Sequence, residues 1–162
     1  AWMVTRDPFW MMSGCLAGII SCAAGLDLWW PPLAFAVAFV GGAALKPLAS
    51  ILENMGIDDA VGAVTVHGTI GAWGVIAVGI FASGYPALSG DAGVATISFV
   101  GQLIGMIVMF LIGFVPGYVV SWILNQLNFL RVDEEDEKAG LDPSKVPAQA
   151  YPEGIPSSPS NN

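Results

Sequence analysis

The chain has 162 residues, of which 55% are hydrophobic and 11% are charged, with a formal net charge of −8. Soluble domains usually carry about 25% charged residues, so this composition argues against an ordinary soluble domain. Between Pro8 and Leu45 the only formal charge is Asp27, and between Ala60 and Leu130 it is Asp91. Such stretches suit lipid and tight helix–helix packing. Much of the acidity lies at 133–137, and without clustered Lys and Arg the sequence argues against a nucleic-acid partner.

Four apolar segments are predicted to cross a lipid bilayer, at about residues 8–24, 31–52, 59–83 and 94–129. The second contains Pro47, which we expect to kink or end its fully apolar part. The fourth, about 36 residues long, would reach about 54 Å as a straight helix, against about 30 Å for a hydrocarbon core. We therefore expect it to tilt and to bend near residues 113–117.

The third segment begins with Asp58 and Asp59. Their carboxylates can cap free N–H groups and face the positive end of the helix dipole, so both are predicted to cap the helix start.

The basic residues predict the orientation of these segments. With four spans, Arg6, Lys46 and Arg131 fall on one side of the membrane, and the loops at 25–30 and 84–93 contain no Lys or Arg. The positive-inside rule places that side, and the C-terminus, in the cytoplasm. Residues 1–130 are thus the membrane part. Residues 131–162 form a cytoplasmic tail, with a short acidic helix possible near 133–139 and disorder toward its Pro- and Ser-rich end.

The sequence opens without an initiator Met and without a signal peptide, as a fragment of a longer protein would. Cys15 and Cys22 are seven residues apart in one apolar segment, too far for an unstrained disulfide within a helix. We expect both to be small buried hydrophobic residues.

His67 is the single histidine, and it lies inside the third segment. An intramembrane ionisable group is a candidate functional residue, but a structural histidine bonded to a neighbouring helix fits equally well. A haem would have only this one histidine as a ligand, since the sequence has no second histidine. The sequence also has no cluster of Cys, His and Asp that could form a metal site, so we expect no cofactor. The sequence also lacks paired catalytic carboxylates or a nucleophile–base pair within the membrane, so we expect no enzyme.

Small residues recur at three- and four-residue steps around this histidine. The series is Ala60, Ala63, His67, Gly71 and Gly74. Small side chains beside a polar group leave room for a narrow passage, or mark a tight helix contact. Spacing alone leaves both open.

The string from Asp58 to Gly74, DDAVGAVTVHGTIGAWG, resembles the histidine helix of ammonium transporters of the Amt/Mep/Rh superfamily. The string SGCLAGI at 13–19 is similar to an earlier helix of that family. Leu130-Arg131-Val132, the acidic run, Gly140-Leu141-Asp142 and Ala150-Tyr151 resemble the cytoplasmic tail of bacterial members. The matches fall in one order and extend to about residue 151.

The resemblance implies an all-α polytopic fold: the last four of eleven transmembrane helices, plus the tail, of a homotrimeric transporter in the inner or plasma membrane. It implies passage of ammonium or ammonia, with His67 as the second of two pore-lining histidines. Ala63 and Gly71 would support the pore helix. The first histidine would lie upstream.

In that family the tail couples subunits and docks PII signalling proteins. The resemblance assigns this regulatory role to Arg131, Gly140, Leu141 and Asp142. The sequence departs from the family pattern at Gly62, where many members have an acid, and at Pro147-Ala148-Gln149, where many bacterial tails have His-Gly-Glu. The alternative function is a partial chain that serves only as an assembly or PII-docking module.

Overall fold

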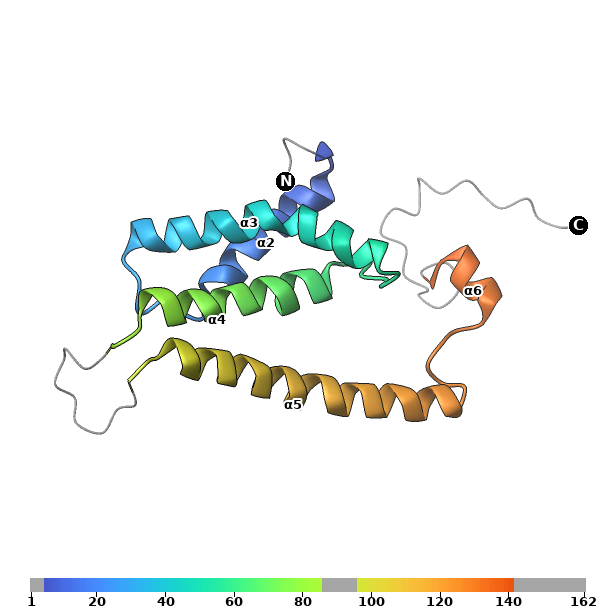
Figure 1. Cartoon of the computed structure of the whole chain (residues 1–162). Helices are drawn as coiled ribbons and strands as arrows, with labels where there is room; N and C mark the ends of the chain where they lie inside the picture. The colour runs from blue at the N-terminus through green and yellow to red at the C-terminus, as the bar shows by residue number, and fades with distance from the viewer. Residues whose placement is uncertain (1–4, 86–95, 142–162) are drawn as a thin grey trace, which may run out of the picture. The chain divides into compact units, whose positions relative to one another are not determined.

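The computed structural model describes residues 5–85 and 96–141, and within these two ranges every regular element is helical (Figure 1). The chain forms two compact units, residues 1–112 and 113–162. The helices are α2 (Pro8–Ala23), α3 (Pro31–Asn54), the π-helix η1 (Val64–Thr69) and α4 (Ile70–Phe81), which continue one another, α5 (Phe99–Gln126) and α6 (Glu134–Ala139).

Three of the described helices are long and apolar enough to cross a membrane. They are α3, the continuous η1–α4 helix (Val64–Phe81) and α5, while α2 is apolar but shorter at 16 residues. The chain is therefore a polytopic membrane protein that is all-helical over its described residues. The short acidic helix expected in the tail is present as α6.

Helix α3 continues through Pro47 to Asn54, so Pro47 does not end the helix. Proline removes one helical hydrogen bond, but tertiary packing can hold the helix together across it. Here Leu45 and Ala49 are both buried, one on each side of Pro47. The Lys46 ammonium also lies 4.2 Å from the centre of the Trp10 ring of α2.

Helices α2, α3 and α4 meet around Ser21, which is fully buried. Its hydroxyl donates a 2.7 Å hydrogen bond to the carbonyl oxygen of Ala17, one turn earlier, so the buried hydroxyl has a hydrogen-bond partner. A Cβ at Gly41 of α3 would lie 1.8 Å from the Ser21 hydroxyl oxygen, and one at Gly74 of α4 would lie 2.7 Å from its carbonyl oxygen. The two glycines therefore allow a close three-helix contact.

Apolar clusters lie along the bundle and use residues from all three helices. One joins Ala17, Leu45, Val66 and Ile70, and the other contains Cys22, Trp29, Val37, Ala77, Val78 and Ala82. Interhelical hydrogen bonds add to this packing: the Trp73 indole donates to the carbonyl of Val37 at 3.2 Å. Of the two cysteines, Cys22 is buried as expected, whereas Cys15 is exposed, and neither forms a disulfide.

We predict that Gly74→Ala destabilises the three-helix unit by about 1–3 kcal/mol, the usual range for overpacking. The reason is that the added methyl would meet backbone atoms of Ser21, which cannot move aside as a flexible side chain does. Unfolding by SDS in mixed micelles, followed by tryptophan fluorescence, measures the change.

Gly113→Ala is the matched control, because an added Cβ there meets nothing within 4 Å. It should leave stability unchanged or raise it by up to about 1 kcal/mol through helix propensity. Equal losses in the two variants would contradict the packing account.

Candidate functional site

The carboxylate of Asp59 caps the N-terminus of the η1–α4 helix, which carries His67. One carboxylate oxygen accepts from the amide of Val64 at 2.9 Å. The other accepts from the amide of Thr65 at 2.8 Å and from its hydroxyl at 2.7 Å. Gly62, with a φ of +73°, makes the turn between the acid and the helix. The neighbouring Asp58 is exposed, so the two acids lie in different environments at this helix start.

The environment of Asp59 lowers its pKa. Burial acts to raise the pKa, but the hydrogen bonds from the Thr65 hydroxyl and from the amides of Val64, Thr65 and Ala63 together outweigh it. The charged carboxylate is therefore the form that this helix start favours.

The first turn of this helix is a π-helix, from Val64 to Thr69. The amide of Ile70 bonds to the carbonyl of Thr65, five residues earlier, instead of to the fourth residue back. The Thr69 hydroxyl donates to the same carbonyl oxygen at 2.5 Å. Single π-turns occur often at functional sites, and this one contains His67.

His67 is exposed on the wall of an apolar groove of about 750 Å³. The groove lies within the first unit and is lined by η1–α4 and the first half of α5. On the η1–α4 side it is lined by His67, Gly68, Gly71, Ala72 and Val75. On the α5 side it is lined by Gln102, Gly105, Met106, Ile107, Met109 and Phe110.

The small residues flagged in the sequence lie in different places. Gly71 lines the groove with His67, but Ala63 lies outside the lining and is exposed. Gly74 instead packs against the backbone of Ser21 on the bundle side. The sequence reading assumed an uninterrupted α-helix from residue 60, whereas the helix begins later and with a π-turn. Gly74 therefore marks a tight helix contact, whereas Gly71 lies on the wall of the groove.

Sequence reasoning did not single out two polar residues near His67. Gln102 is a polar side chain in an otherwise apolar stretch of α5, and with Gly105, Met106 and Met109 it occupies one helical face. Thr65 is fully buried and bonded to Asp59. A polar residue in a membrane segment is the signal that could have identified either one. Within the described ranges, no three His, Cys, Asp or Glu side chains gather closely enough to hold a metal ion.

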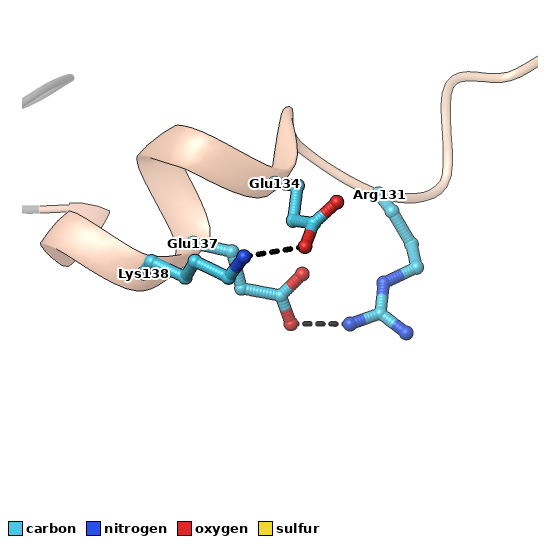
Figure 2. Close-up of polar contacts among 4 residues, drawn as sticks. All are labelled: Arg131, Glu134, Glu137 and Lys138. Carbon is cyan, nitrogen blue, oxygen red and sulfur yellow. Dashed lines mark hydrogen bonds and ion pairs between the residues drawn. The ribbon is translucent and has the colours of Figure 1, made fainter.

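The tail residues lie in the second unit, around α6. Arg131, ahead of the helix, pairs with Glu137, and Lys138 pairs with Glu134 at 2.5 Å (Figure 2). Gly140 follows the helix with a φ of +94°, a conformation that glycine adopts without strain. Leu141 is exposed, and Asp142 lies outside the described residues.

These features define the class of protein: a polytopic helical membrane protein with one histidine on the wall of an apolar groove. The sequence model of the Ammonium Transporter Family matches residues 6–151, and the chain belongs to that family.

Curated relatives carry the same family name. The chain is 34% identical over 149 residues to ammonium transporter Amt2 of Methanocaldococcus jannaschii, covering 91% of this chain and 34% of the relative. It is 35% identical over 148 residues to Amt2 of Archaeoglobus fulgidus (86% and 32%) and 37% identical over 150 residues to Amt1 of M. jannaschii (91% and 37%). The chain thus spans about a third of the length of these relatives. No solved structure gives a significant match.

We predict that Asp59→Asn weakens the first unit in a pH-dependent way. Because the folded pKa is lowered, the carboxylate contributes stability above the ordinary unfolded value of about 3.9, and this contribution is lost as pH falls through the folded pKa. SDS unfolding of both proteins between neutral pH and about pH 3 measures the difference, which should be present at neutral pH and shrink in acid.

Asp58→Asn is the control, since it makes the same chemical change at an exposed neighbour. A stability difference for Asp59→Asn that stays constant across the pH range would contradict the assignment.

We also predict that Arg131→Gln lowers the helical population of 134–139, because it removes the ion pair with Glu137. An exposed pair contributes about 0.2–1 kcal/mol, and the loss should vanish near about 1 M salt, where charges are screened within about 3 Å. Carbon-13 Cα shifts report the helicity. Glu135→Gln, a change of one exposed charge in the same helix, is the control, and a salt-independent loss would contradict the prediction.

Proposed function

We propose that this chain takes part in transmembrane transport of ammonium or ammonia, with His67 as one of a pair of pore-lining histidines. The observation that carries the proposal is the position of His67: in a chain of this family, its single histidine lies on the wall of an apolar groove.

The chemistry of the groove suits a small hydrogen-bonding molecule. A bare cation loses a large hydration energy on entering apolar surroundings, whereas neutral ammonia does not. A neutral imidazole offers one donor and one acceptor nitrogen, so it can bond to ammonia and can also accept a proton. An otherwise apolar passage with an imidazole on its wall would therefore favour the neutral molecule over potassium.

The second histidine of the pair would come from a segment outside this chain, because His67 is its only histidine. We place the chain as the last four of eleven transmembrane helices, with α2 as the first of the four, in a bacterial-type homotrimer. Its site would be the inner or plasma membrane, with the C-terminus in the cytoplasm. The absence of Lys and Arg from the sequence at 25–30 and 84–93 supports this orientation. Ala63 and Gly71 would support the pore helix.

The tail around Arg131, Gly140, Leu141 and Asp142 would be regulatory and could dock a PII signalling protein. The ion pairs of Arg131 with Glu137 and of Lys138 with Glu134 support an ordered surface around α6. A chain that acts only as an assembly or PII-docking module has less support, because the family match covers residues 6–151, the membrane helices as well as the tail.

We predict that His67→Ala in the complete transporter lowers ammonium transport, or its selectivity against potassium, by about tenfold. Losing one hydrogen bond to the passing molecule corresponds to about 1–1.5 kcal/mol of barrier, which is about a factor of ten in rate. Ammonium-dependent current and flux in proteoliposomes measure the effect, and membrane assembly should be unchanged.

His67→Gln separates the two roles of the imidazole. Glutamine keeps a hydrogen-bond donor and acceptor but cannot take up a proton, so retained flux would indicate a polar step and lost flux a proton route. Ile80→Ala, at an exposed position near the far end of α4, is the control. Flux and selectivity that match wild type in both His67 variants would make His67 structural.

A further inference from the structure

Thr65 joins the capping acid to the turn that carries His67. It is 0% exposed, and its amide and hydroxyl both donate to the same oxygen of Asp59, at 2.8 and 2.7 Å. A buried hydroxyl without a partner is unfavourable, so this side chain is held firmly against the carboxylate.

The carbonyl of Thr65 holds the other end of the turn. It accepts from the amide of Ile70, which is the bond that makes the turn a π-helix, and from the hydroxyl of Thr69 at 2.5 Å. One residue thus contacts the cap on one side and closes the wide turn on the other. His67 lies between Thr65 and these two donors.

The direction of the His67 side chain depends on this hydrogen-bond register. Successive residues of an α-helix are rotated by about 100° around its axis. A π-turn contains one extra residue, so relaxing 64–69 to α-helical bonding would rotate the residues before the turn by about that angle relative to α4, and His67, inside the turn, by part of it. Such a rotation would turn the imidazole away from Gly71 and Val75, which share the groove wall with it.

We infer that Thr65 is a positioning residue for His67. Through its bonds to Asp59, Thr69 and Ile70 it holds residues 64–69 in the π-helical register, and that register directs the imidazole into the groove. The consequence for transport rests on the proposed function above, but the positioning itself does not.

The test uses the full-length protein in lipid nanodiscs and nitrogen-15 spectra of the His67 imidazole, identified as the signal that His67→Gln removes. Thr65→Val keeps the shape of the side chain and removes the hydroxyl, so the positions of the His67 signals should change. Thr65→Ser keeps the hydroxyl and should retain the wild-type spectrum. Ser21→Ala is the matched control, because it removes an equally buried hydroxyl that bonds within α2.

A Thr65→Val spectrum identical to wild type overturns the inference, and so does an equal change in Ser21→Ala. If Thr65→Val does not fold, Asp59→Asn replaces it: the amide keeps the volume but weakens the bonds from Val64 and Thr65, so the same signals should shift. Unshifted signals in that variant overturn the inference.

Transport separates this inference from the proposed function. Thr65→Val should lower ammonium flux while Thr65→Ser retains it. Shifted His67 signals together with flux that is unchanged in His67→Gln and His67→Ala would support the positioning role and contradict the transport role of His67.

Discussion

Hydrogen bonds from the first residues of the η1–α4 helix to Asp59 hold in place the turn that carries His67. Free amides at a helix start need acceptors, and apolar surroundings provide few. One carboxylate bonds to two successive amides and one hydroxyl, so the first turn has a defined position relative to the chain before it. His67 follows two residues after the last of these contacts, so its position is set by the cap together with the packing of Val66 and Ile70 in the bundle.

The bundle itself depends on small residues at particular points. Ser21, Gly41 and Gly74 allow three helices to approach so closely that a single methyl would collide with backbone or hydroxyl atoms. In a membrane the lipid is as apolar as the side chains, so this kind of van der Waals contact supplies much of the association between helices. No described residue of α5 is buried, so its apolar surface requires lipid or further protein around it.

The sequence predicted features that depend on residue type over a stretch. Apolar length indicated the helices, the acids Asp58 and Asp59 before an apolar run indicated a cap, of which Asp59 makes the hydrogen bonds, and the isolated histidine marked a candidate residue that lies on the groove wall. The π-turn could not be predicted, because it depends on how the bonds of Thr65 and Thr69 compete with α-helical ones in the folded chain. The same unrecognised turn separates Ala63, which precedes it, from the α-helical spacing that relates it to His67 and Gly71. Local rules for proline also do not predict that α3 stays helical through Pro47, where Leu45 and Ala49 on either side are buried.

The two walls of the groove differ in how far they can move. The η1–α4 wall near His67 contains Gly68, Gly71 and Ala72, where the surface is mostly backbone and can change only if the helix moves. The opposite wall contains Met106 and Met109, unbranched side chains with several rotatable bonds that adapt to different shapes. Rotamer changes in such side chains take picoseconds to nanoseconds, far less than helix motions need. The width of the groove beside His67 can therefore fluctuate while the backbone around it stays in place.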